Sequence, residues 1–287
     1  MDPRYQILEN LKVSYNYFKI KLTAPGTPVP KLGQFYQIRC STTTDPLLRR
    51  PFSVHRFVQL GNIAHLEILY RVAGKGTEWL SNRKKHEFLD ILGPFGNGFI
   101  LDEGNFPLVI VSRGIGIAPL YAVGEEVRKR DNKREIFILM GARLKERVFY
   151  ESECKSLGKV FIYTDDGSIG FHGRAPDLLL HLLQEKKLPE KFTLCACGPA
   201  QMLKELDELS VRFGFRGQVA MEDRMGCGFG ACLSCVCPLR VSEIVINEQW
   251  EKPALQWSED GTQVFSLVCK DGPVYDLNEV DWNEWTA

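Results

Sequence analysis

The chain has 287 residues, of which 44% are hydrophobic and 25% are charged, a composition typical of a soluble globular protein with roughly two domains. Its 36 basic and 36 acidic residues balance, which argues against nucleic acid as the main partner. The sequence lacks both an apolar run of about 18 residues and a signal-peptide pattern, so we expect a cytoplasmic protein without a membrane span. The odd number of cysteines, nine, argues against a disulfide framework.

The first hundred residues predict an antiparallel β-domain. Short strands are expected at 35–40, 65–72 and 88–92, separated by proline and glycine, with only a short helix at 77–84. Many short strands with turn signals predict a sandwich or a barrel. We assign residues 1–103 to this β-barrel domain.

From residue 107 the pattern changes to alternating strands and helices. The expected strands are 107–111, 135–141, 160–164 and 192–197, and the expected helices are 114–130, 149–156, 175–186 and 200–213. This alternation predicts a parallel sheet with helices on both faces, the α/β domain of residues 104–220. Residues 221–287 hold five of the nine cysteines and form a small third module.

The cysteines of this module are spaced as ligands of an iron–sulfur cluster. Cys227, Cys232 and Cys235 have the C-x4-C-x2-C spacing of a plant-type [2Fe–2S] site, and the glycines among them allow a tight loop. The fourth ligand is Cys237 or Cys269. We favour Cys269, because Cys237 is too close to Cys235 for both to reach the second iron with good geometry. The alternative is a zinc site, which commonly uses C-x2-C pairs, but only one clear pair is present.

Two segments of the β-domain are candidates for binding a flavin dinucleotide. An arginine fork followed by a proline-fixed turn and a hydroxyl suits a pyrophosphate, and a tyrosine can stack on a flavin ring. A glycine and a threonine at a helix start can present N–H and hydroxyl groups to phosphate. The candidate residues are Arg50, Pro51, Phe52 and Ser53, then Leu69, Tyr70 and Arg71, then Gly76 and Thr77. The alternative is a core tyrosine and an ordinary hairpin turn.

Two turns of the α/β domain are candidates for binding a nicotinamide dinucleotide. Gly114 and Gly116 follow a buried strand and open a helix, where glycines let a pyrophosphate approach the helix N-terminus. Cys197, Gly198 and Pro199 end the fourth expected strand. Ligands of parallel sheets bind outside the carboxyl ends of the strands, so we expect Cys197 beside a nicotinamide or flavin ring. The alternative is that Cys197 is only a buried strand residue.

The order of these motifs resembles the ferredoxin-reductase superfamily. Within it, the segments 92–99, 225–232 and 268–274 are similar to the electron-transfer subunits of NAD-dependent (class 1B) dihydroorotate dehydrogenases. The resemblance implies FAD on the barrel, NAD(H) as substrate of the α/β domain and a [2Fe–2S] cluster on Cys227, Cys232, Cys235 and Cys269. It also implies a partner, the FMN-containing catalytic subunit that oxidises dihydroorotate. Electrons would then pass in pairs between NAD(H) and FAD, and singly to the cluster.

Three departures from the family pattern leave alternatives open. Ser112 and Arg113 replace glycines before the nucleotide turn, which would alter nucleotide affinity or the choice between NAD and NADP. A long segment separates Cys235 from Cys269 and would reshape the partner surface, while 85–87 replaces a Gly-Asp turn in a hairpin. The alternatives are a ferredoxin-type reductase subunit of another iron–sulfur flavoenzyme complex, and a regulatory subunit without a working nucleotide site. Glu222 and Asp223 are expected near the flavin, with no assigned role.

Overall fold

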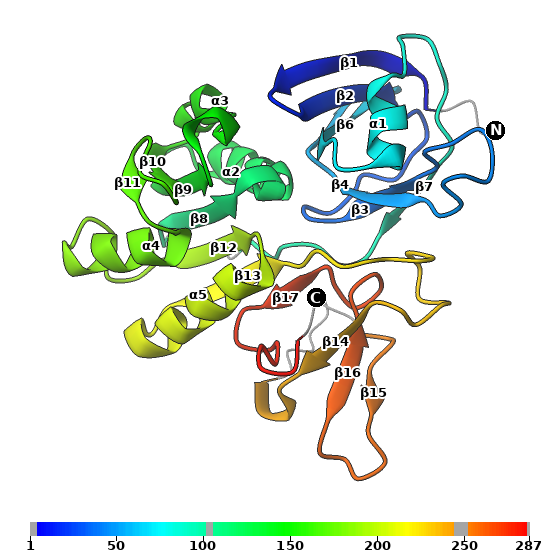
Figure 1. Cartoon of the computed structure of the whole chain (residues 1–287). Coiled ribbons are helices and arrows are strands. Elements are labelled where there is room, and N and C mark those ends of the chain that lie inside the picture. Colours follow the sequence, from blue (N-terminus) through cyan, green and yellow to red (C-terminus); the bar gives the residue numbers. More distant parts are fainter. Residues whose placement is uncertain (1–4, 102–105, 244–251, 286–287) are drawn as a thin grey trace.

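The computed structural model describes residues 5–101, 106–243 and 252–285, and its N-terminal part consists of two antiparallel sheets (Figure 1). The first has the order β1-β2-β6-β5 and the second the order β4-β3-β7. The elements of this part are β1 Ile7–Ser14, β2 Tyr17–Thr23, β3 Phe35–Ile38, β4 Arg50–Ser53, β5 Arg56–Leu60, β6 Ile63–Arg71, α1 Lys75–Ser81 and β7 Ile91–Phe95. The expected barrel therefore takes the form of two separately hydrogen-bonded sheets.

One hydrophobic core lies between these two sheets. Ile20 and Ile68 from the first sheet, Tyr36 and Ile38 from the second, and Leu80 of α1 are all buried in it. Period-two alternation in β2 and β6 directs their apolar side chains to this core. The two sheets are thus held together by burial of apolar surface rather than by a continuous hydrogen-bonded ladder.

Two boundaries in this part differ from expectation for local reasons. Helix α1 starts two residues early, because the Thr77 hydroxyl accepts hydrogen bonds from the N–H groups of Ala73 (2.8 Å) and Gly74 (3.1 Å). Phe88 makes only an isolated bridge, and the strand expected at 88–92 begins at Ile91. In the turn before it, His86 has a φ of 75°, a conformation that glycine adopts more easily, so this departure stays within a turn.

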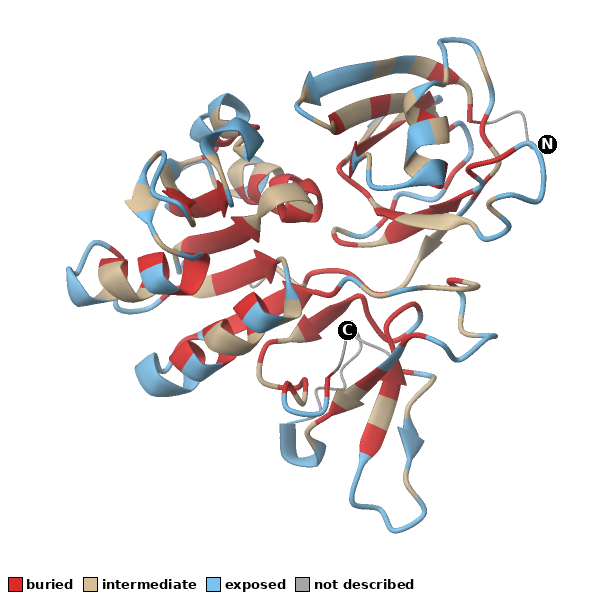
Figure 2. Cartoon of the chain, viewed as in Figure 1, coloured by how far each residue is buried: buried red, intermediate tan, exposed pale blue. Residues whose placement is uncertain are grey.

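The α/β part contains the predicted parallel sheet, in the order β11-β10-β9-β8-β12-β13-β17. Its strands are β8 Leu108–Arg113, β9 Ile136–Ala142, β10 Lys159–Thr164, β11 Phe171–His172, β12 Thr193–Cys197, β13 Arg216–Ala220 and β17 Val274–Asp276. Its helices are η1 Gly114–Gly116, α2 Ile117–Arg130, η2 Lys145–Arg147, α3 Glu151–Lys155, α4 Ala175–Gln184 and α5 Ala200–Phe213. In Figure 2 the central strands are buried and the helices expose their outer faces.

The strand order changes direction between β8 and β12. From β8 the chain adds β9 and β10 on one side, and it then returns to add β12 and β13 on the other. Such a switch point is where open α/β sheets bind ligands, outside the carboxyl ends of the strands. Among the described residues, no helix combines the length and the apolar character needed to cross a bilayer.

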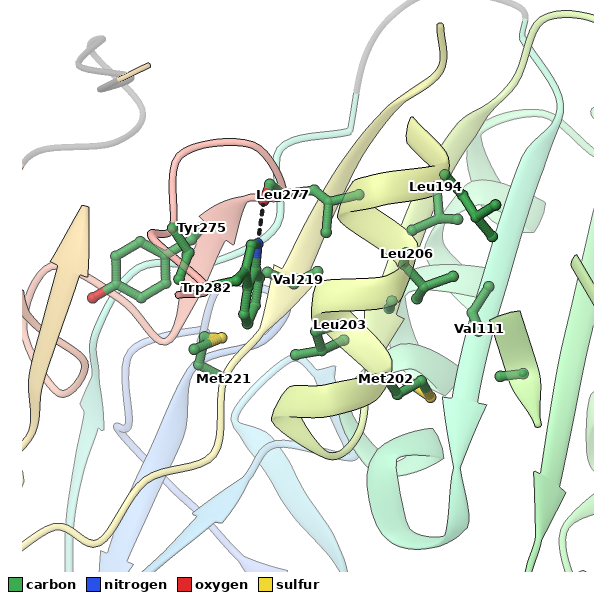
Figure 3. Packing of buried hydrophobic residues seen from close by; sticks show 14 of the residues in the cluster. Val111, Leu194, Met202, Leu203, Leu206, Val219, Met221, Tyr275, Leu277 and Trp282 are labelled. Atoms are coloured by element: carbon green, nitrogen blue, oxygen red, sulfur yellow. Dashed lines mark hydrogen bonds between the residues drawn. The ribbon is translucent and has the colours of Figure 1, made fainter. Parts of the chain in front are cut away.

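The cysteine-rich part is joined to this sheet rather than separate from it. It forms a three-stranded antiparallel sheet of β14 Val236–Leu239, β16 Val264–Leu267 and β15 Gln256–Trp257, with the short turn η3 Val241–Glu243. Its strand β17 pairs antiparallel with β13 at the edge of the α/β sheet. Tyr275, Leu277 and Trp282 continue the core of α5 and β13, and the Trp282 Nε1 donates to the Leu277 carbonyl at 3.0 Å (Figure 3).

Candidate functional site

A cavity of about 230 Å³ lies where the three parts of the chain meet. Six of the nine candidate flavin residues line it: Pro51, Phe52, Ser53, Leu69, Tyr70 and Arg71. The α/β part contributes Ile115, Ala118 and Pro119 from the turn after β8 and the start of α2. The segment leading to the cysteine loop contributes Met221, Glu222, Asp223 and Met225. Phe35, Ala73 and Pro273 complete the lining, and none of these three was a candidate site residue.

The other three flavin candidates lie together just beyond this lining. The Arg50 side chain runs along Gly76, where a Cβ would be 3.4 Å from Arg50 Cγ. Its Nη1 donates to the Leu48 carbonyl at 2.8 Å. The Thr77 hydroxyl is already engaged at the start of α1, since it donates to the Gly74 carbonyl at 2.9 Å. Arg50 and Gly76 are therefore neighbours in space, although 25 residues lie between them in the sequence.

Tyr70 occupies a core position at the edge of the cavity. It is 1% exposed, and its hydroxyl donates to Asn10 Oδ1 at 2.9 Å. Its ring packs against Phe18 and Phe52, each with a centroid distance of 5.8 Å. Burial raises the pKa of the phenol, so the hydroxyl stays protonated as a donor. Tyr70 is therefore mainly a core residue, and only part of its side chain reaches the cavity.

The two nucleotide turns meet at the carboxyl edge of β8 and β12. Gly114 has a φ of 55°, and a Cβ on Gly116 would lie 2.2 Å from the Cys197 carbonyl oxygen. Only glycine permits this approach of the two turns. A Cβ on Gly198 would lie 2.5 Å from Met202 Cε, and Pro199 is the N-cap residue of α5. The structure therefore brings together the candidate residues that sequence reasoning had placed on two separate turns.

Cys197 is buried behind the cavity, near enough to Glu222 of its lining to feel that charge. Cys197 is 2% exposed, and burial, with a smaller effect from the negative charge of Glu222, raises the pKa of its thiol. A neutral thiol is not a nucleophile, so any role of Cys197 is through contact and shape. Burial also raises the pKa of the Glu222 and Asp223 carboxyls, and Arg71 partly opposes this at Glu222.

The cysteine loop provides N–H donors to its own sulfurs. Cys227 Sγ accepts hydrogen bonds from the N–H groups of Ala231 (3.2 Å) and Cys232 (3.4 Å), while Cys232 Sγ accepts one from Cys227 (3.4 Å). The Ser234 hydroxyl lies 3.1 Å from Cys232 Sγ, and its hydrogen bond is the largest cause of the lowered pKa of Cys232. Thiolates held in this way are the usual ligands of iron–sulfur centres.

The two buried cysteines nearest this loop form a second pair. The Cys235 and Cys269 side chains are hydrogen-bonded to each other, which lowers the pKa of Cys235 and raises that of Cys269. The Val268 N–H donates to the Cys235 carbonyl at 2.9 Å and ties the two segments together. Cys237, fully buried in β14, instead directs its sulfur to the Pro238 carbonyl at 3.7 Å.

The donor set in this loop fits a binuclear centre. The thiols occur in two pairs, Cys227 with Cys232 and Cys235 with Cys269, as two metal atoms with two thiolates each would require. Within the described ranges, no group of three or more His, Cys, Asp or Glu side chains is arranged to hold a single metal ion.

Strand β3 contacts both the cavity and the cysteine loop, and it carries a buried amide. Gln37 of β3 is 0% exposed, and neither polar atom of its side chain has a hydrogen-bond partner among the described residues. A Cβ on Gly228, whose φ is 82°, would lie 2.1 Å from Gln37 Nε2. On the same strand Phe35 lines the cavity, and its ring contacts Phe95, which in turn contacts Phe229 of the loop. Sequence reasoning missed Gln37, because nothing in the sequence marks a strand glutamine as unpaired.

Two family models match the chain in the regions just described. The Oxidoreductase NAD-binding domain matches residues 110–208, which contain both nucleotide turns. The Iron-sulfur cluster binding domain of dihydroorotate dehydrogenase B matches residues 222–247, which contain the cysteine loop. The two matches cover the α/β part and the start of the cysteine-rich part.

Similar proteins extend the match over nearly the whole chain. The chain is 34% identical over 281 residues to the dihydroorotate dehydrogenase B (NAD(+)) electron transfer subunit of Desulforamulus reducens, covering 96% of this chain and 97% of that protein. It is 36% identical to the same subunit of Geobacillus thermodenitrificans, over 91% of each chain. A solved NADH-dependent reduced ferredoxin-NADP oxidoreductase superposes with a TM-score of 0.76 and 25% identity, over 98% of this chain and 90% of its own. The ferredoxin reductase of carbazole 1,9a-dioxygenase shares the fold, with a TM-score of 0.61 and 19% identity over 74% of this chain and 65% of its own. The chain therefore belongs to the family of electron transfer subunits of dihydroorotate dehydrogenase B (NAD(+)).

Proposed function

We propose that this chain carries electrons between NAD(H) and a catalytic subunit that contains FMN and oxidises dihydroorotate, by way of FAD and a [2Fe–2S] cluster. Family membership supports the assignment. The observation that carries it is the single cavity lined by the flavin candidates, the turn after β8 and the segment leading to the cysteine loop. A group bound there touches both the nucleotide edge and the entrance to the cysteine loop.

The flavin would occupy this cavity. Phe52, Leu69 and Tyr70 offer the apolar surface for its rings, while Arg50 and the start of α1 lie beyond the cavity, where its phosphates would extend. When bound, FAD supplies the exchange between two-electron hydride transfer and one-electron transfer. The proposed flavin-binding residues are Arg50, Pro51, Phe52, Ser53, Leu69, Tyr70, Arg71, Gly76 and Thr77.

NAD(H) would bind across the carboxyl edge of the α/β sheet. Gly114 and Gly116 let the pyrophosphate approach the turn before α2, and Gly198 and Pro199 flank the nicotinamide. Cys197 would lie beside the nicotinamide or flavin ring. As a neutral, buried thiol it would take no proton in the transfer.

The cluster would be held by Cys227, Cys232, Cys235 and Cys269. The pairing of the thiols suits two iron atoms with two thiolate ligands each, and the loop N–H groups that donate to the Cys227 sulfur would stabilise its charge. When bound, the cluster accepts and releases one electron at a time. The loop itself is exposed around Cys232, so the partner subunit would approach from this side.

The three parts would act as domains of residues 1–103, 104–220 and 221–287. The first boundary lies outside the described residues, and β17 of the third part is shared with the sheet of the second. The chain would work in the cytoplasm, where thiols stay reduced and free to bind a cluster.

The test is to purify the chain together with its natural partner and to measure flavin, iron and electron transfer. We expect FAD and iron in the complex, FMN in the partner, bleaching of the flavin bands by NADH, and reduction of the flavin by dihydroorotate. Zinc in place of iron, or a preparation free of flavin, would contradict the proposal.

A second candidate partner follows from the structural comparison. The likeness to the NADH-dependent reduced ferredoxin-NADP oxidoreductase covers 98% of this chain, so the same cofactors would also serve a ferredoxin-linked complex. The subunit that co-purifies decides between them. An FMN protein that oxidises dihydroorotate supports the first candidate, and a large iron–sulfur flavoprotein supports the second.

A further inference from the structure

The position of the cavity fixes which way a bound dinucleotide runs along the sheet. The cavity lies beside the turn after β8 and the end of β13, and no residue of β9 or β10 lines it. With the nicotinamide at the cavity and the pyrophosphate at Gly114–Gly116, the adenosine half extends to the other side of β8, over the carboxyl ends of β9 and β10. This step rests on the proposed binding of NAD(H).

An ion pair crosses this end of the sheet. The Arg113 guanidinium, at the end of β8, donates to both carboxylate oxygens of Asp165, which follows β10, at 3.0 and 2.5 Å. Strand β9 lies between them, and its Gly141 pairs with both Arg113 and Tyr163; a Cβ there would be 2.1 Å from the Tyr163 carbonyl oxygen. Tyr163 fills the space that a side chain at Gly141 would need, and its hydroxyl donates to the Ser112 carbonyl at 2.9 Å, which ties the end of β10 to the end of β8. Both partners keep part of their surface exposed, 26% and 29%.

The next residue adds a negative charge at the same place. Asp166 is exposed, and its Oδ1 accepts hydrogen bonds from the Ser168 hydroxyl (2.6 Å) and N–H (3.1 Å). These bonds lower the pKa of Asp166, so it is ionised at neutral pH. Asp165 balances the positive charge of Arg113, so these three side chains together carry one net negative charge, that of Asp166.

This charge arrangement distinguishes the two pyridine nucleotides. They differ by one phosphate on the adenosine ribose, and a phosphate dianion is repelled by a nearby carboxylate. A ribose that carries only hydroxyl groups can instead donate to carboxylate oxygens. A free arginine would reverse the preference, because its planar fork matches a phosphate in two hydrogen bonds.

We propose that Asp165 is a specificity-determining residue that withholds Arg113 from phosphate and so reserves this edge of the sheet for NAD(H) over NADP(H). Arg113 replaces a glycine of the family pattern, and its guanidinium would bind a phosphate if Asp165 did not pair with it. Asp165 turns it into a neutral pair, and Asp166 adds to the repulsion of a second phosphate group.

The test compares two adenosine fragments that need no electron transfer. Binding of 5′-AMP and 2′,5′-ADP to the purified complex is measured by calorimetry for the wild type and for Asp165→Asn, which keeps the side-chain shape. We expect the affinity ratio to shift toward 2′,5′-ADP by about tenfold or more, the effect of one charge-assisted hydrogen-bonded pair. In the double variant Arg113→Ala/Asp165→Asn the gain is lost. Arg113→Ala alone shifts the ratio the other way, because it frees the Asp165 carboxylate.

A matched control breaks an ion pair at the opposite edge of the same sheet. Lys159 Nζ lies 2.9 Å from Glu135 Oε1 at the amino ends of β10 and β9, so Glu135→Gln is expected to leave the ratio unchanged. A ratio in Asp165→Asn within twofold of the wild type would overturn the proposal. So would a gain that survives in the double variant, which would assign phosphate binding to another cation such as Arg143.

The same variants separate this inference from the proposed function. Flavin bleaching by NADPH relative to NADH is expected to rise in Asp165→Asn in step with the fragment ratio. If 5′-AMP binds and the ratio shifts but NADH bleaches no flavin, the electron-transfer proposal fails while the role of Asp165 stands. If NADH bleaches the flavin and the ratio does not shift, the role of Asp165 fails while electron transfer stands.

Discussion

The cysteine loop and the flavin cavity are built in opposite ways. In the loop, donors and acceptors lie within a few residues of each other, as the N–H groups of Ala231 and Cys232 do at Cys227 Sγ. The cavity joins side chains from β3, β4, β6, α2 and the segment after β13, which lie far apart in the sequence. Spacing in the sequence thus encodes the loop of Cys227, Cys232 and Cys235, whereas the approach of Cys269 and the cavity exist only when the whole fold is in place.

The largest expected effect tests which cysteine completes the loop. Cys269→Ser removes a thiol hydrogen-bonded to Cys235 and is expected to cost nearly all of the bound iron. Cys237→Ser is the matched control, because its sulfur contacts the Pro238 carbonyl and not the other cysteines. Iron content and the visible spectrum of the purified complex measure both.

The same two variants decide whether Cys269 or Cys237 is the fourth ligand. Iron retained in Cys269→Ser and lost in Cys237→Ser would reverse the assignment of the fourth ligand. Flavin content is expected to stay unchanged in Cys269→Ser, because no cysteine lines the cavity. Loss of both cofactors together would show that the loop and the cavity are not independent.

Acid is expected to lower the free energy of unfolding, because a buried histidine lies between the β-part and the α/β part. His55 Nδ1 donates to the Ala118 carbonyl at 2.9 Å, and its Nε2 accepts from the Tyr150 hydroxyl at 2.7 Å. Burial lowers the pKa of His55 to about 4, with smaller contributions from Lys19 and Arg56. The unfolded chain, with a pKa of about 6.5, therefore binds the proton first.

The sign follows from this order of protonation. The contribution of neutral His55 to the free energy of unfolding is complete above a pH of about 6.5. It is lost as the pH falls toward about 4, by up to roughly 3 kcal/mol. We expect His55→Gln to be less stable at pH 7 and to lose this part of the pH dependence. Chemical denaturation between pH 4 and 7 measures it, and an equal slope in variant and wild type would exclude His55 as the cause.

A smaller effect is expected where the loop touches the flavin part. Gly228→Ala places a Cβ against the Gln37 side chain at a φ of 82°, so it combines a clash with backbone strain. Gly61 has a φ of 59° and open space around it, so Gly61→Ala measures the strain alone, about 1 kcal/mol. We expect Gly228→Ala to cost about 1–2 kcal/mol more than the control in urea unfolding. Equal costs would mean that the loop moves away from Gln37 freely.

The same difference between local and distant contacts explains what the sequence could predict. Strands β8, β9, β10 and β12 were predicted because each is a largely apolar run in a regular alternation with helices. Strand β17 was missed, because a three-residue strand after a glycine-rich turn has no pattern of its own. The Arg113–Asp165 pair joins the ends of two strands that β9 separates in the sheet, and no spacing in the sequence reveals that the two side chains meet.

The smallest effect concerns two glutamines on the same stretch of chain. Gln34 is satisfied, since its Oε1 accepts from the Lys31 N–H at 2.8 Å and its Nε2 donates to the Gly96 carbonyl. Gln34→Leu is therefore expected to cost about 1–2 kcal/mol, whereas Gln37→Leu removes an unpaired buried amide and is expected to change the stability of the cofactor-free chain by less than about 1 kcal/mol. In the loaded complex the cost of Gln37→Leu rises if a bound group supplies the missing partner. Urea unfolding of both forms measures this difference, and an equal, large cost of Gln37→Leu in both would mean that the amide is already satisfied within the protein.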